Sequence, residues 1–229
     1  MSELVATPPK QAPRAETTRM FESDFFEWFS RIHPSVPFVA WIPIMSFVLY
    51  RSYCRHILGF ASTAGLYILG MLLWSGTEYL LHRFVFHWTR DTAFGRRLHF
   101  LVHGVHHDYP NDKDRLVMPL GASIPIGVLF YVLYYFTVGP VIGEPIYAGM
   151  ALGYMAYDGT HYAVHHFRPR TRIGRYLRRH HMLHHHLDHS GGFGVSSPLW
   201  DIIFGTMPAP KRSQRRDGGA GTGPVDAAA

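Results

Sequence analysis

Ten histidines in four tight groups are the residues of this chain best suited to chemistry. The groups read HRFVFH, HGVHH, HYAVH and HMLHH. Their histidines are His82, His87, His103, His106, His107, His161, His165, His181, His184 and His185. Neutral imidazole is the side chain that most often binds transition metals. The chain has 17 histidines but only one cysteine, Cys54, so the pattern indicates all-imidazole rather than thiolate ligation.

The spacing within the groups places most of these side chains on shared helix faces. In HGVHH and HMLHH the histidines stand at positions i, i+3 and i+4, and in HYAVH at i and i+4. HRFVFH differs, because five residues turn an α-helix by about 500°, so His82 and His87 point about 140° apart. Either the two side chains straddle the site and serve different metals, or the helix ends between them.

Ten imidazoles supply two metals with about five nitrogen ligands each, or four with open positions for oxygen and substrate. Such ligation leaves the metal charge without anionic ligands, so nearby carboxylates are expected to accept the outer ring N–H groups. The candidates are Glu78, Asp108, Asp158, Asp188 and Asp201. A loose metal-buffering tract would instead show irregular spacing within one low-complexity segment. The remaining histidines fall outside the spacing pattern and are interpreted as polar neighbours.

Long uncharged stretches separate the histidine groups. Residues 57–74 and 116–138 contain no charged side chain. A helix of 18 residues is about 27 Å long, close to the hydrocarbon thickness of a bilayer. Residues 36–50 are also uncharged, and residues 141–157 carry only Glu144. We therefore predict an all-α integral membrane protein with four transmembrane helices at about these positions and a histidine-rich di-metal cap.

The basic residues predict the orientation in the membrane. Six Lys or Arg lie in residues 75–115 and ten in residues 158–229, whereas residues 139–145 have none. By the positive-inside rule, both histidine-bearing segments are cytoplasmic. Arg51 and Arg55 then fall on the opposite side, which is an exception to the rule. The sequence has no nucleic-acid-binding motif, and its basic residues are interleaved with the histidines.

The segments outside the spans complete the predicted organisation. Residues 1–20 are expected to be a disordered leader, without the apolar core of a secretory signal. Aromatic residues spaced by three and four predict an amphipathic helix over residues 21–35, lying in the membrane interface or packed on the protein surface. Residues 36–207 form the membrane domain, and residues 208–229 are a Gly/Ala-rich disordered tail.

The membrane setting favours redox chemistry over hydrolysis. Zinc would bind many of these nitrogens, but it is redox-inert. The surroundings offer acyl chains, and breaking an unactivated C–H bond requires dioxygen activated by a redox metal. The prediction is therefore two iron ions, with zinc as a substitute, using dioxygen and an external electron donor on a fatty-acyl lipid.

Five segments resemble the sterol desaturase/fatty-acid hydroxylase superfamily of membrane di-iron oxygenases, most closely its fatty-acid (ceramide) 2-hydroxylases. They are EYLLHRFVFH, HFLVHGVHHDYPND, GYMAYDGTHYAVHH, HHMLHHH and GFGVSSPLWDIIFGT. The resemblance implies four membrane helices, a cytoplasm-facing di-metal cap and (R)-2-hydroxylation of an acyl chain. It carries metal-ligand roles onto the ten grouped histidines. It also implies that Tyr154, Tyr157 and Asp158 line the catalytic site.

The resemblance also bears on partners and location. Many relatives carry a fused cytochrome b5 domain with a His-Pro-Gly-Gly motif, whereas here His33 is followed by Pro34 and Ser35. We therefore expect a separate electron-transfer protein, and a bacterial inner membrane in preference to the endoplasmic reticulum. The alternatives are a desaturase or hydroxylase of sterols or other lipids, a structural zinc scaffold and a metal transporter. A transporter would carry polar ligands at mid-membrane, and the two most apolar spans have none.

Overall fold

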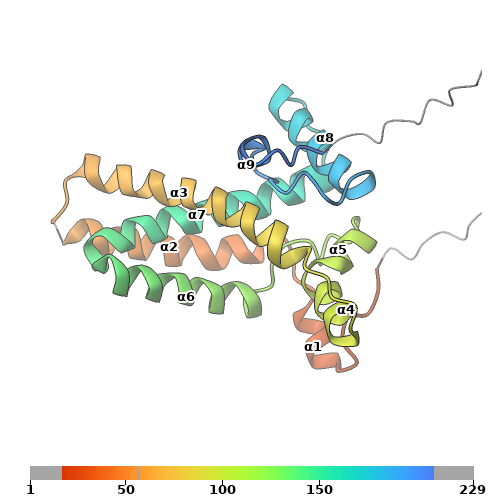
Figure 1. The fold of residues 1–229 in the computed structure, drawn as a ribbon. Helices are drawn as coiled ribbons and strands as arrows, with labels where there is room; N and C mark the ends of the chain where they lie inside the picture. The colour runs from red at the N-terminus through yellow and green to blue at the C-terminus, as the bar shows by residue number, and fades with distance from the viewer. Residues whose placement is uncertain (1–16, 56, 209–229) are drawn as a thin grey trace, which may run out of the picture.

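Every regular element in the computed structural model, which describes residues 17–55 and 57–208, is a helix. Four long helices run side by side: α2 (Val36–Cys54), α3 (Phe60–Leu81), α6 (Leu120–Thr137) and α7 (Gly139–His166) (Figure 1). The shorter elements gather at one end of this bundle and are called the cap (Figure 1). They are α1 (Asp24–Phe29), η1 (His82–Phe86), α4 (Ala93–His99), η2 (Phe100–Gly104), α5 (Val105–Asp108), α8 (Arg172–His186) and α9 (Leu199–Ile203). The predicted all-α fold is confirmed for the described residues.

In the part of the chain that the structure describes, three helices are long and apolar enough to cross a membrane. They are α2, α3 with its continuation to Phe86, and α6. Their outward side chains are largely aliphatic and aromatic and are exposed, as lipid-facing surfaces are. The chain is therefore an integral membrane protein. The fourth predicted span corresponds to α7, which lies between the others, and its crossing of the bilayer stays a prediction.

The helices differ from the predicted spans at their ends. α2 continues through Pro43 to Cys54, and α3 begins at Phe60 and runs well past residue 74. α6 begins only at Leu120, because Pro119 disfavours helical backbone at the residue before it. The predicted helix over residues 21–35 contains only the six residues of α1. The predicted disordered segments 1–20 and 208–229 lie outside the described residues, apart from residues 17–20 and 208.

Glycines bring α3 and α7 into close contact. A Cβ atom added to Gly70 of α3 would collide with the Ile146 carbonyl oxygen of α7. In the same way, a Cβ atom on Gly149 of α7 would collide with the Tyr67 carbonyl oxygen of α3. Small residues permit such backbone approach in membrane helices. This contact fixes the position of α7, which carries part of the histidine constellation, relative to α3, which leads into the rest.

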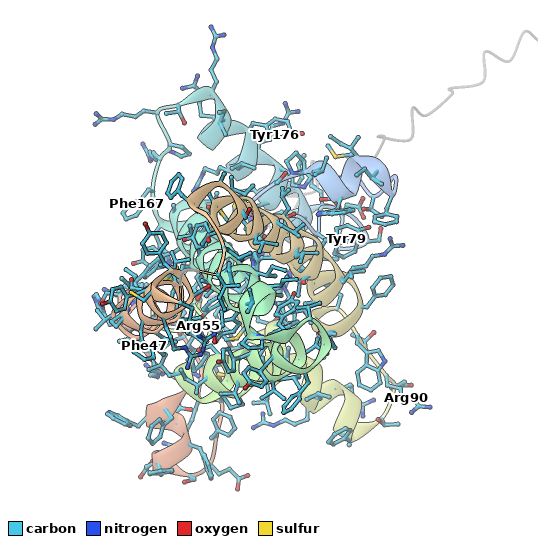
Figure 2. The ribbon with its side chains drawn as sticks, turned by 90° about the vertical axis from the view of Figure 1, so that its left-hand side faces the viewer. Phe47, Arg55, Tyr79, Arg90, Phe167 and Tyr176 are labelled. Atoms are coloured by element: carbon cyan, nitrogen blue, oxygen red, sulfur yellow. The ribbon has the colours of Figure 1, made fainter. Side chains whose placement is uncertain are left out.

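A buried ion-pair network at the bundle end opposite the cap accounts for the exception to the positive-inside rule. Glu144 of α7 is only 1% exposed and pairs with Arg51 and Arg55 of α2. The Arg55 Nη1 to Glu144 Oε2 distance is 2.9 Å, and the Tyr131 hydroxyl of α6 also donates to Glu144. Figure 2, which views the bundle from this end, labels Arg55. Glu144 thus offsets one of the two positive charges, and the network ties α2, α6 and α7 together.

Replacing the carboxylate should loosen this end of the bundle. We expect Glu144→Gln to lower the free energy of unfolding by about 2 kcal/mol, because a buried charged partner of two arginines is lost. Thermal unfolding of the detergent-solubilised protein would measure the effect. Glu22→Gln, at an exposed position, is the matched control and should leave the midpoint unchanged. Equal midpoints for both variants would show that the network is not stabilising.

Candidate metal centre

The cap brings the ten grouped histidines together as two adjoining clusters of five. The first, called the His82 cluster, contains His82, His87, His103, His107 and His184. The second, called the His106 cluster, contains His106, His161, His165, His181 and His185. Within each cluster, one ring nitrogen from every member lies within 4.8 Å of the others. The clusters are neighbours, because the rings of His107 and His185 stack at a centroid distance of 4.2 Å.

A π-helical turn places both histidines of HRFVFH in the same cluster. Residues of η1 wind more widely than an α-helix, and the His87 N–H donates to the His82 carbonyl oxygen at 3.2 Å. The side chain at i+5 therefore returns over position i, and the two Nε2 atoms are 3.2 Å apart. The alternative in which the two histidines serve different metals is wrong, because both belong to one cluster. The helix does end between them, at Phe86, after a π turn that the α-helical geometry did not predict.

The two HxxHH groups each supply both clusters. His103 and His107, one turn apart, belong to the His82 cluster, whereas His106 between them belongs to the His106 cluster. In the second group the pair at i and i+4, His181 and His185, enters the His106 cluster, and His184 enters the other. Because each of these two segments contributes histidines to both clusters, the clusters must be adjacent.

Backbone carbonyls direct two imidazole lone pairs into the His82 cluster. The His82 Nδ1 lies 2.7 Å from the Phe193 carbonyl oxygen, and the His184 Nδ1 lies 2.7 Å from the Gly191 carbonyl oxygen. A carbonyl only accepts, so each Nδ1 carries the proton and each neutral ring offers a bare Nε2 lone pair. Both Nε2 atoms face the His87 Nε2, at 3.2 and 3.0 Å. One N–H cannot satisfy both lone pairs, whereas a metal cation can, so the donor set fits a transition-metal ion.

Burial keeps these rings in the neutral form that binds metals. Desolvation, followed by the nearby histidines, lowers the pKa of His87 to about 3. Burial likewise lowers the pKa of His184 to about 4, although its bond to the Gly191 carbonyl acts in the opposite direction. The pKa values of His103 and His106 are also lowered well below the usual range, mainly by burial. The lone pairs are therefore available at neutral pH without loss of a proton.

Two buried carboxylates hold the loop that carries these carbonyls. Glu78 of α3 accepts from the backbone N–H groups of Val195 and Ser196, at 2.7 and 2.8 Å. Asp201 of α9 accepts from the N–H groups of Phe193 and Gly194, at 3.0 and 2.8 Å. The expectation that Glu78 and Asp201 bind the ring N–H groups of the ten histidines is wrong. These carboxylates bind the loop backbone, and the loop backbone in turn binds the rings.

Two adjacent glycines, Gly191 and Gly192, are the sequence feature that marks this loop. Gly192 has a φ of +79°, and a Cβ atom there would lie 3.2 Å from the His184 Cβ. A side chain is therefore disfavoured where the loop passes the cluster. The carbonyls of Gly191 and Phe193 were missed, because a backbone acceptor has no residue type to mark it. Asp201 also pairs with His180 at 3.1 Å, so this histidine is a neighbour of the clusters rather than a member.

Tyr154, Tyr157 and Asp158 lie on α7 one or two turns before His161. All three are buried, and the Tyr157 ring is 5.6 Å from the His161 ring. Tyr154 lines an apolar cavity within the bundle. The other lining side chains include Trp41, Trp74, Leu81, Met118, Phe130 and Met150. The Tyr154 hydroxyl lies beside the Asp158 carboxyl. The Trp74 Nε1–H is buried without a hydrogen-bond partner among the described residues.

The position of this cavity relates it to the histidines. Leu81, at its edge, directly precedes His82, and Tyr154 is two helical turns from His161. The cavity thus lies within the bundle on the side of the clusters, and its lining is almost wholly apolar. A chain-shaped apolar molecule matches this lining.

Comparisons with known proteins agree with this geometry. Residues 67–206 match the model of the fatty acid hydroxylase family. The dihydroceramide fatty acyl 2-hydroxylase FAH1 of Arabidopsis thaliana is 36% identical over 203 residues, which cover 87% of this chain and 85% of the plant protein. The fatty acid 2-hydroxylase of Homo sapiens is 37% identical over 221 residues, covering 87% of this chain and 59% of the human protein.

A solved structure is also similar. It is described as full-length scs7p with only the hydroxylase domain visible, and it superposes with a TM-score of 0.77 at 32% sequence identity. The alignment covers 82% of this chain and 71% of that one. Together with the two histidine clusters and the membrane helices, these matches show that the chain belongs to the fatty acid hydroxylase family.

Proposed function

We propose that the chain is a membrane di-iron oxygenase that hydroxylates a fatty-acyl lipid, a fatty acid or a ceramide, at carbon two. The observation that carries the proposal is the convergence of ten imidazoles on two adjoining clusters beside an apolar cavity. The hydroxylase relatives, with similarity over most of the chain, support the same reaction. In the net reaction one atom of dioxygen enters the C–H bond and the other leaves as water, with two electrons and two protons supplied.

The ten histidines would hold two metal ions, one in each cluster. Bound iron would supply the oxidising power that an unactivated C–H bond requires, which zinc would not. The chain's own part is to keep the rings neutral, to aim their lone pairs and to exclude water. Burial performs the first and third tasks, and the carbonyls of Gly191 and Phe193 perform the second.

The cavity explains why carbon two would be selected. This carbon lies beside the polar head of an acyl chain, at the level where the bundle meets the cap. With the alkyl tail among Trp41, Trp74 and Met150, the head would meet the buried hydroxyl of Tyr154 and the neighbouring carboxyl of Asp158. We propose that these groups, with Tyr157, orient the head and so fix which carbon faces the metals.

We further propose that the cap faces the cytoplasm, because the basic residues are concentrated at the cap end. A separate electron-transfer protein would deliver the electrons there. The membrane would be a bacterial inner membrane or, as the alternative, the endoplasmic reticulum. The direct test is mass spectrometry of lipids from expressing and empty cells. Accumulation of 2-hydroxy acyl species supports the proposal, and a sterol or alkene product contradicts it.

Removing one imidazole should eliminate turnover without disturbing the membrane domain. We expect His184→Ala to abolish the 2-hydroxy product and to lower the metal content per chain, while membrane insertion is retained. His186→Ala, at an exposed neighbouring position, should keep both metal and activity. Metal analysis and product assays on the same preparations would measure this. Normal product from His184→Ala would refute the assignment of His184 as a ligand.

The role proposed for Asp158 separates positioning from metal binding. We expect Asp158→Asn to reduce turnover by at least about tenfold through a misplaced substrate, with little change in metal content. Asp91→Asn makes the same chemical change at an exposed carboxylate outside the histidine groups and should be neutral. Turnover measured against metal content tests the role. Unchanged turnover, or a loss of metal that accounts for the whole defect, would contradict it.

Replacing Asp201 should weaken metal binding and leave the position of the substrate unchanged. Phe193 and Gly194 donate to different oxygens of Asp201, so in Asp201→Asn the amide NH₂ group would face one of these two N–H groups and the loop that orients His82 and His184 would loosen. We expect metal affinity to fall by about 10–100-fold, as is typical when supporting groups around a metal site are lost. The rate of metal loss to a chelator measures this, with Asp91→Asn as the control. Identical rates would argue against such a role.

A further inference from the structure

The N-terminal half of α8 presents a basic surface that the metal centre does not use. Five exposed arginines lie just before or along this half: Arg168, Arg170, Arg172, Arg175 and Arg179. No Asp or Glu occurs in the sequence between Asp158 and Asp188. Among residues 17–55 and 57–208, none of the five arginines forms an ion pair. Such uncompensated charge favours an anionic partner.

The helix directs this basic face away from the metal centre and projects it beyond the bundle. Arg172, Arg175 and Arg179 stand at i, i+3 and i+7 and share one face. His181 follows Arg172 by nine residues, or about two and a half turns, and so lies on the opposite face. Viewed along the bundle from the end opposite the cap, α8 extends sideways past the long helices (Figure 2). Its N-terminal half therefore lies beyond the cross-section of the bundle, on the side where lipid would surround the long helices.

A groove with mixed chemistry runs along this part of α8. Arg172, Ile173 and Tyr176 line one wall, and Ser196, Ser197 and Pro198 line the other. Ile173 is 73% exposed although it is a large aliphatic residue. Beyond Pro198, α9 packs against α3 and adds further exposed aliphatic and aromatic side chains. Guanidinium, hydroxyl and apolar groups thus meet where the membrane helices end.

We propose that this groove binds the phosphate headgroup of an anionic phospholipid in the leaflet nearest the cap. Guanidinium groups bind phosphate with charge-assisted, often bidentate, hydrogen bonds, and Ser197 offers a hydroxyl donor in the same groove as Arg172, whereas the Ser196 hydroxyl donates to Glu78. Ile173 and Tyr176 would contact the acyl region below the headgroup. An acidic electron-transfer protein would match the charge as well. A soluble partner, however, would not explain why the large aliphatic side chain of Ile173 is exposed or why α8 projects sideways beyond the bundle. The inference depends on the membrane location of the bundle and not on the proposed reaction.

A fluorescent label at the groove would test the lipid site in the full chain. Cys54→Ser removes the native thiol, and Ile173→Cys introduces the site for an environment-sensitive label. In nanodiscs, brominated phosphatidylglycerol should quench the label more than brominated phosphatidylcholine at equal mole fraction. Arginines near a membrane surface favour anionic lipid by about fivefold each. We therefore expect the preference to disappear in a variant that combines Arg172→Gln, Arg175→Gln and Arg179→Gln.

Matched controls separate the site from net charge and from folding. A variant with Arg19→Gln, Arg90→Gln and Arg96→Gln makes the same charge change at exposed positions elsewhere on the cap and should keep the preference. A label at Asn111→Cys, in an exposed turn, should not be quenched. Unchanged metal content would verify that the arginine variant is folded.

Several results would overturn the proposal. One is equal quenching by the two lipids, or no quenching by either. Another is a preference that survives in the α8 arginine variant. A response to inorganic phosphate in nanodiscs of pure phosphatidylcholine would indicate a site for the free ion. A response only to an added acidic ferredoxin or cytochrome b5 would indicate a protein-docking surface instead.

Discussion

The structure depends on holding uncharged imidazoles with their lone pairs directed at two small volumes. Lone pairs repel one another, and a buried nitrogen without a proton or a metal partner is unfavourable. The rings of His82, His87 and His184 therefore gain their full stabilisation only when a cation lies between them. Until then the surrounding protein must keep them in place, and much of the fold serves that purpose.

The support comes from rigid contacts rather than from additional ligands. Close packing of Gly70 and Gly149 fixes α7 against α3, so the histidines at the ends of both helices are set in register. Glu78 then crosses from α3 to the loop that follows α8, and Asp201 holds the same loop from α9. Three segments distant in the sequence are thereby joined at one point. The carboxylates act on the imidazoles through backbone N–H and C=O groups, which leaves the metal pocket free of anions.

Much of the fold and of the candidate site could be predicted because the relevant signals are local. Apolar runs close in length to the hydrocarbon thickness of a bilayer predicted the helices of the bundle, and histidines at helical spacing predicted which side chains would converge. Local patterns failed where the backbone departs from α-helical geometry. At η1 the π turn brings the His82 and His87 side chains to the same side of the helix, whereas α-helical geometry predicted that they point apart. At α7 the charge of Glu144 is unfavourable in a predicted membrane span, and the sequence does not show that Arg51 and Arg55 pair with it.

The sequence by itself determined the ligand chemistry and the membrane setting, because residue type and short-range spacing encode both. Only the tertiary structure decided how the histidines divide into two clusters, since His103 and His107 separate from His106 according to what α7 and α8 present opposite them. It also decided that the Gly191 and Phe193 carbonyls orient the rings, because every residue has a carbonyl and none is distinguished by its side chain. Long-range placement of equivalent backbone groups is a property of the fold and leaves no mark in local spacing.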